Sequence, residues 1–247
     1  SSEGLTEDDL ASIRLTEGVE AVQGAMIQDA ALYYTAGGEE GGDGSPKKEA
    51  LIKLYSLPIV EEAPGLAAKP AVFEQRGLDI DPEPETWLNR PVTRQGRLPL
   101  ADGEIALDHF FAQDAGIKIG DELILENYGV QKRLTVTGLV DSPLYIYVGR
   151  GSSSLGSGTN QAFGLASGND ISALGPKLPF GAALQRRYSA AYVTVSGAAG
   201  LNSLLPEYKS AVQPVKDRLK SLGDEDDWHV LTRAEANDGY SGFSDDS

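Results

Sequence analysis

Few side chains in this sequence are of the types that enzymes use as bases, nucleophiles or metal ligands. The chain has two histidines, His109 and His229, and no cysteine. Serine catalysis needs a serine, a base and a group that orients the base. The sequence lacks the Gly-x-Ser-x-Gly turn that presents such a serine. We therefore predict no catalytic residue, and expect both histidines to be partly buried or surface side chains.

Alternating acidic residues between positions 79 and 85 form a pattern that could hold a cation. In an extended segment Asp79, Asp81, Glu83 and Glu85 would face one side, and calcium prefers such oxygen ligands. The spacing and the central glycine of an EF-hand are absent, so solvated carboxylates are the better explanation. Thiolate metal sites and disulfides are excluded by the absence of cysteine. We predict no metal site and no cofactor.

A segment rich in glycine and serine, residues 149–159, has the composition of a loop that could cradle a phosphate. It reads GRGSSSLGSGT, lacks the Gly-Lys-Ser/Thr ending of a P-loop and does not open an evident helix. Such a composition is typical of a flexible loop. Binding of a peptide or partner by this loop stays open as an alternative, since exposed loops often carry function.

The overall composition excludes several classes of partner. The formal net charge of −16 argues against binding nucleic acid or an anionic membrane through a charged face. No apolar run approaches the length that spans a bilayer, and the first residues lack the basic and apolar regions of a signal peptide. A chain of 247 residues can bury a proper core and divide into two lobes.

The densest run of structural signals lies in the middle of the chain. A strand is predicted over Glu104–Leu107, and Asp108 is placed to cap a helix over His109–Ala115. Alternation of apolar and polar residues around Leu123 and Leu125 predicts a half-buried strand. Its expected partner is the next alternating stretch, residues 134–140. These elements are all short, which indicates a compact β-rich module.

An ordered series of short motifs runs through this module. It reads GR-x-P, EI-x-L, A-x-x-x-G-x-K-x-GD-x-L-x-L and TV-x-G-x-V-x-SP. The matching positions are Gly96, Arg97, Pro99, Glu104, Ile105, Leu107, Ala112, Gly116, Lys118, Gly120, Asp121, Leu123, Leu125, Thr135, Val136, Gly138, Val140, Ser142 and Pro143. The series resembles the extracytoplasmic domain of FtsX/MacB-type ABC transporter permeases. Residues 192–232 look more loosely like the closing strand, helix and strand of such domains.

The resemblance implies a soluble domain held between two membrane helices on the extracytoplasmic face of the bacterial cell membrane. In such permeases a cytoplasmic ABC ATPase drives the membrane helices, which pass their motion to the external domain. We therefore expect a non-enzymatic domain that couples this motion to an unknown external substrate or protein. A free-standing secreted binding module of similar fold is the alternative, and an enzyme with an unrecognised site is a third.

The elements on either side of the module predict how two lobes are built. The sequence signals indicate a capped helix at 7–17, strands at 19–34 and 50–57, a strand at 190–195, a helix at 204–222 and a strand at 228–231. We predict an α+β fold in which residues 1–86 and 186–247 form a mixed α/β lobe and residues 87–185 an inserted β-rich lobe. Four strands should then share one sheet, those around Val22, Leu54, Val193 and Val230.

A domain between consecutive membrane helices must also have both ends on one side. Neighbouring helices pack about 8–10 Å apart, so Leu5 and Arg233 should lie within roughly 25 Å of each other. The helix that begins at Glu7 would then continue, or closely follow, the first membrane helix.

Overall fold

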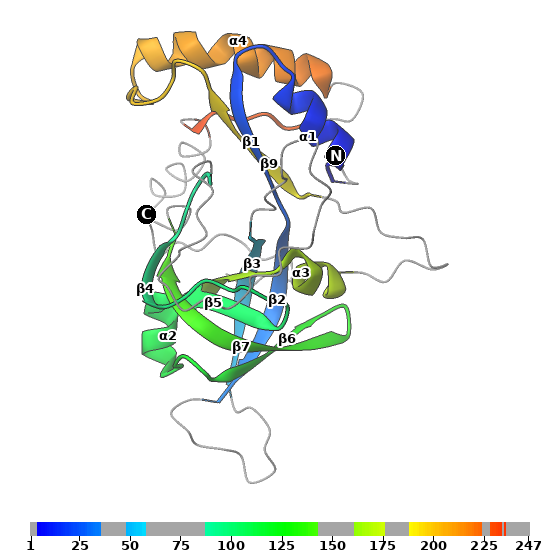
Figure 1. Cartoon of the computed structure of the whole chain (residues 1–247), viewed down its shortest axis with the longest axis vertical. Helices are drawn as coiled ribbons and strands as arrows, with labels where there is room; N and C mark the ends of the chain where they lie inside the picture. Colours follow the sequence, from blue (N-terminus) through cyan, green and yellow to red (C-terminus); the bar gives the residue numbers. More distant parts are fainter. Residues whose placement is uncertain are drawn as a thin grey trace, which may run out of the picture. The chain divides into compact units, whose positions relative to one another are not determined.

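The helices and strands of the chain form an α+β fold, as predicted (Figure 1). The parts that the computed structural model describes are residues 4–35, 48–57, 87–142, 161–175, 188–223, 228–233 and 235. The acidic row at 79–85 and the Gly/Ser segment at 149–159 lie outside these described residues. Among the described helices, none is long and apolar enough to cross a bilayer.

Contacts between residues divide the chain into two compact units. Unit 1 comprises residues 1–25 and 180–247, and unit 2 comprises residues 26–179. One unit is thus made from the first and last parts of the sequence, with the other inserted between them. The boundaries observed at 25/26 and 179/180 differ from those predicted at 86/87 and 185/186.

The main elements among the described residues of unit 1 are two helices and a two-stranded antiparallel sheet. Its elements are α1 Glu7–Arg14, β1 Val19–Ala25, β9 Ala190–Val195 and α4 Pro206–Leu222. Strands β1 and β9 pair with Val22 opposite Val193. Helix α4 carries the predicted apolar stripe, because Val212, Val215 and Leu219 are buried.

Helix α4 begins without a side-chain cap and contains an internal proline. Leu205 is the N-cap residue, and its side chain makes no capping hydrogen bond. Pro206 suits the first turn because it has no N–H group that would need a partner. Pro214 lies inside the helix and does not divide it in two.

The start of α1 is fixed by its own cap and by a link to a distant part of the chain. Thr6 is extended, with φ −97° and ψ 173°; its Oγ1 accepts from Asp9 N, and the Asp9 carboxylate accepts from Thr6 N. Leu5 and Tyr188 exchange two backbone hydrogen bonds of 2.7 Å each. Since Leu5 and Thr6 are not helical, α1 begins at Glu7, and of the two expected relations to a preceding membrane helix only that of closely following it stays as a prediction.

The segment after α4 folds back on the end of that helix. Trp228 N donates to the Gly223 carbonyl at 3.1 Å, and a Cβ atom at Gly223 would lie 2.2 Å from the Trp228 ring. The predicted closing strand over Trp228–Leu231 is therefore wrong, because these residues pack on a helix end instead of pairing with a strand. Thr232 and Glu235 then form a second cap, in which Glu235 N donates to Thr232 Oγ1 at 3.2 Å.

The described residues of unit 2 form a β-barrel with one added strand and two short helices (Figure 1). Its elements are β2 Ile27–Tyr34, β3 Lys48–Ser56, β4 Val92–Gly96, β5 Glu104–Asp108, α2 His109–Ala115, β6 Glu122–Asn127, β7 Val130–Asp141, β8 Ala162–Ala166 and α3 Gly168–Ala173. Neighbouring strands pair in the order β7–β5–β8–β3–β2–β6, and β6 pairs again with β7, which closes the ring. Strand β7 takes part twice because its early residues pair with β6 and its later residues with β5. Strand β4 adds to β7.

Apolar side chains from the strands of this ring fill its interior. The largest fully buried side chains include Leu32, Ile52, Leu54, Ile105, Leu107, Leu123, Leu125, Leu134 and Val136. The predictions for the central module are confirmed: Leu123 lies opposite Leu134, Asp108 caps α2, and Gly116 ends α2 in the left-handed conformation with φ 74°.

The prediction that strands around Val22, Leu54, Val193 and Val230 share one sheet is wrong. Val22 pairs with Val193, but Leu54 lies opposite Gly164 in the barrel. The predicted strand at 19–34 is divided at Met26, whose N–H donates to Ser56 Oγ at 3.0 Å. The physical reason is that the strands of unit 2 close into a ring. The central module has too few strands to enclose a core by itself, and β2 and β3 complete the ring.

Candidate functional site

One of the two histidines lies beside a carboxylate. His109 is the first residue of α2, and its Nδ1 lies 3.7 Å from Asp141 Oδ1, beyond hydrogen-bond distance. Both atoms are buried and have no hydrogen-bond partner within the described part of the chain. The other oxygen of Asp141 accepts from Arg94 Nε at 2.5 Å. Two residue types of a catalytic triad are thus adjacent, but they are not hydrogen-bonded to each other, and the Arg94 guanidinium already occupies the second carboxylate oxygen.

His229 belongs to unit 1 and His109 to unit 2. Within the described residues, no group of three or more His, Asp or Glu side chains is placed to hold a metal ion. The prediction that the chain has no catalytic or metal site stays a prediction, because the acidic row at 79–85 and the Gly/Ser segment at 149–159 are not described.

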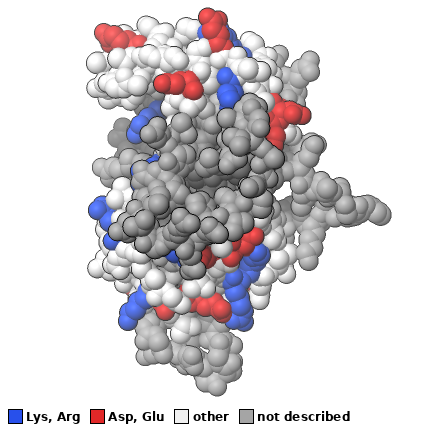
Figure 2. All heavy atoms as spheres, in the orientation of Figure 1, with Lys and Arg blue, Asp and Glu red and all other residues white. Residues whose placement is uncertain are grey.

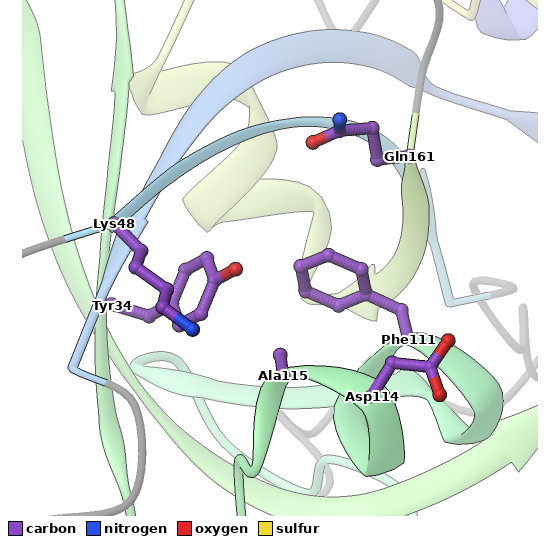
Figure 3. Close-up of a pocket in the computed structure, with 6 residues that line it drawn as sticks. All are labelled: Tyr34, Lys48, Phe111, Asp114, Ala115 and Gln161. Atoms are coloured by element: carbon purple, nitrogen blue, oxygen red, sulfur yellow. The ribbon is translucent and has the colours of Figure 1, made fainter.

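An open pocket of about 280 Å³ lies on the barrel (Figure 3). It is lined by Tyr34, Lys48, Phe111, Asp114, Ala115 and Gln161. These residues come from the end of β2, the start of β3, one face of α2 and the residue before β8. Barrel closure brings these four parts of the chain together, because β2 pairs with β3 and β3 pairs with β8.

Two aromatic rings form the centre of the pocket. The ring centroids of Tyr34 and Phe111 lie 5.6 Å apart at an interplanar angle of 76°, an edge-to-face contact. Both side chains are largely buried. Burial raises the pKa of the Tyr34 hydroxyl, which therefore stays protonated at neutral pH and can donate a hydrogen bond.

Other polar groups of unit 2 hold its elements together. Asp170 is fully buried, where it accepts from Gly103 N at 2.7 Å and pairs with Lys132. Arg97 and Glu104 form a two-point ion pair with distances of 2.7 and 2.6 Å. This pairing holds the pKa of Glu104 below its ordinary value. Such satisfied ion pairs connect turns to strands and leave little capacity for a ligand.

The glycines of the motif series also have structural roles. Gly96 has φ +67°, and a Cβ atom there would lie 2.3 Å from the Thr137 carbonyl oxygen. At Gly138 a Cβ atom would lie 2.2 Å from the Arg97 carbonyl oxygen. These two positions let β4 and the following turn pack closely on β7. The motif therefore describes how the module is built and does not mark a site of chemistry.

Charged side chains on the face that Figure 2 draws are interspersed. Lysines and arginines alternate with aspartates and glutamates over the described part of this face, and form no continuous basic stripe there. A stripe of that kind is the usual footprint of nucleic-acid binding. The arrangement agrees with the charge argument made from the sequence.

No family model matches the sequence, and no curated protein matches it. Among solved structures, the chain is similar to the extracellular domain of the noncanonical ABC-type transporter YknZ from Gram-positive bacteria. The identity is 12% and the TM-score 0.47, over 93% of this chain and 88% of that one. It is also similar to the periplasmic region of MacB from Actinobacillus actinomycetemcomitans. There the identity is 14% and the TM-score 0.45, over 99% of this chain and 85% of that one.

Both of these structures are domains of the kind that the motif series resembles. Identities of 12% and 14% with TM-scores of 0.47 and 0.45 show a similarity of structure only. They assign no residue role, substrate or partner to this chain.

Sequence patterns single out none of the pocket residues. The Gly- and acid-rich segment 37–45, whose composition predicts a hairpin tip, lies between Tyr34 and Lys48, and the Gly/Ser segment 149–159 comes just before Gln161. Asp114 looks like any other polar residue of the predicted helix. Their meeting depends on strand pairs far apart in sequence, such as Ile52 opposite Ala162.

Proposed function

We propose that the chain is the extracytoplasmic domain of an FtsX/MacB-like ABC transporter permease. In this role it does no covalent chemistry. It passes motion from membrane helices, driven by a cytoplasmic ABC ATPase, to an external substrate or partner.

The observation that best supports the proposal is that unit 1 is built from the first and the last parts of the sequence. Residues 4–25 and 188–235 form one unit, and residues 26–175 are inserted between them. The Leu5–Tyr188 bridge and the β1–β9 pairing join the two parts of unit 1 directly. This arrangement suits a domain tethered at both ends, because both connections then load the same unit.

The ordered motif series adds independent support. Its glycines, its Arg97–Glu104 ion pair and its Asp121 turn build consecutive parts of β4 to β7. A series that matches by chance would not be expected to occupy structural positions in one continuous module.

Motion would enter unit 1 through an extended segment. Because Thr6 is extended and α1 begins at Glu7, a membrane helix preceding the chain could not run on as one rigid rod. Force on the first residues would instead reach β9 through the backbone hydrogen bonds between Leu5 and Tyr188.

The proposal is tested with the full-length protein in its native membrane. These 247 residues contain no cysteine, so one introduced at the exposed residue Thr93 is the single labelling site within them, and the full-length protein without the Thr93→Cys change is the control for labelling elsewhere. A membrane-impermeant maleimide should label it in intact cells, the protein should stay in the membrane after carbonate extraction, and an ATP-binding cassette subunit should copurify. Labelling only after lysis would contradict the proposal.

A free-standing secreted binding module is the second candidate, and the same experiment separates the two. Such a module would be released from the membrane by carbonate, without an ATPase.

A further inference from the structure

The pocket on the barrel carries polar groups that the proposed function does not use. They are the Lys48 ammonium, the Asp114 carboxylate, the Tyr34 hydroxyl and the Gln161 side-chain amide. Within the described residues, none of these four groups has a hydrogen bond or ion pair. Lys48, Asp114 and Gln161 are exposed at the rim, whereas Tyr34 is buried below it.

The two charges are arranged on opposite sides of the aromatic rings. Figure 3 shows Lys48 on one side of Tyr34 and Phe111, and Asp114 on the other. No salt bridge joins them among the described residues, although they line the same pocket. A ligand that pairs with both would carry an ammonium and a carboxylate at opposite ends of an apolar body.

We propose that this pocket binds a short apolar peptide with free ends. The amino end pairs with Asp114 and the carboxylate end with Lys48. An apolar side chain packs against Phe111, and the Gln161 amide and Tyr34 hydroxyl hydrogen-bond to the peptide group between the ends. A volume of about 280 Å³ is at the small end of ligand pockets, which selects a ligand of dipeptide size.

This inference goes beyond the proposed function and does not depend on it. Binding would take place on unit 2 alone, whether or not the chain is tethered to membrane helices. A failure of the binding experiment therefore leaves the permease proposal untouched, and the reverse also holds.

The experiment is isothermal titration of the 247-residue chain with the dipeptide Leu-Phe and its two blocked forms. The free dipeptide should bind with one-to-one stoichiometry. N-acetylation removes the charge that pairs with Asp114, and C-amidation removes the charge that pairs with Lys48. Each block should weaken binding about five-fold, the effect of losing one solvent-exposed ion pair.

Two variants assign each end of the peptide to its partner. In Asp114→Asn, acetylation should no longer matter while amidation still weakens binding. In Lys48→Gln the pattern should be reversed. Glu20→Gln and Lys118→Gln change the same charges at positions outside the pocket, and both blocks should keep their full effect there.

Three results would overturn the proposal. They are no saturable binding up to about 10 mM dipeptide, equal affinity for free and blocked dipeptides, and unchanged sensitivity to both blocks in both pocket variants. Because the blocked dipeptides are compared on the unmodified chain, the test does not depend on the variants being folded.

Discussion

Gly138 lies in the middle of β7, directly against the backbone of Arg97. A methyl group at this position would lie 2.2 Å from the Arg97 carbonyl oxygen and 2.9 Å from its carbonyl carbon. Neither atom can move without separating β4 from β7. We expect Gly138→Ala to lower the free energy of unfolding by about 2–3 kcal/mol, the cost of overpacking a rigid site.

Urea unfolding of Gly138→Ala and of Gly103→Ala checks this expectation. Gly103 has φ +84°, but a Cβ atom there would meet no other atom within 4 Å. Gly103→Ala should therefore lower the free energy of unfolding only by the cost of holding alanine in the left-handed conformation, about 1 kcal/mol. An equal loss in the two variants would show that crowding at Gly138 is not the cause.

Glu235 carries the clearest electrostatic signal in unit 1. Its carboxylate accepts from Lys216, which is largely buried on α4, and from Thr232 N at 2.8 Å. The hydrogen bond with Lys216 is the main reason that the pKa of Glu235 is lowered from 4.5 to about 2. The unfolded chain therefore binds this proton more readily, and stability falls as the pH drops from about 4.5 toward 2.

The urea midpoint, measured against pH, should fall less steeply over this window in Glu235→Gln than in the unmodified chain. Because Glu235 is at the surface, salt should reduce the difference. Glu20→Gln, which removes an exposed acid elsewhere in unit 1, should leave the slope unchanged. Parallel curves for the unmodified chain and Glu235→Gln would contradict the assignment.

Helix α1 begins with a reciprocal cap between Thr6 and Asp9. The two hydrogen bonds between Thr6 and Asp9 satisfy N–H groups that the helix cannot satisfy itself. Thr6→Ala should lower the free energy of unfolding by about 1 kcal/mol, and Thr6→Ser should restore most of the loss. Thr16→Ala is the control, since the Thr16 hydroxyl only bonds to the Ser12 carbonyl on the surface. A Thr6→Ala loss no larger than that of Thr16→Ala would argue against the cap.

Elements with a strong local signal can be predicted well. The Thr6 and Asp108 caps, the end of α2 at Gly116 and the β6–β7 hairpin all follow from residues close together in sequence. The partners of β2 and β3 do not follow in this way. Alternation shows which side of a strand is buried, but Leu54 could pack equally well in either unit.

The pocket illustrates the same limit at the level of a site. Tyr34 and Gln161 come together only because β3 pairs with β2 on one side and with β8 on the other. The pairing of β3 with β8 is parallel and joins residues more than a hundred positions apart, and no local pattern encodes it. The motif residues, in contrast, are evident in the sequence because they lie close together and shape turns.

At the scale of the whole molecule, the predicted closeness of Leu5 and Arg233 is still to be measured. Both belong to unit 1, and a domain held between neighbouring membrane helices should keep them within roughly 25 Å. Spin labels on cysteines introduced at Asp8 and Arg233, both exposed, would report this distance without interference from native thiols. A distribution centred well beyond this limit would argue against tethering at both ends.

The pairing of Leu5 with Tyr188 also sets the order in which the parts of the chain can become ordered. The barrel can close once β8 has been synthesised, but Leu5 cannot form its two backbone hydrogen bonds until Tyr188 is present. Glu7 and Tyr188 are 181 positions apart, which corresponds to roughly 10–40 s of synthesis. Leu5 is thus made before the barrel strands but gains this partner after them, and the segment around it must stay soluble throughout that interval.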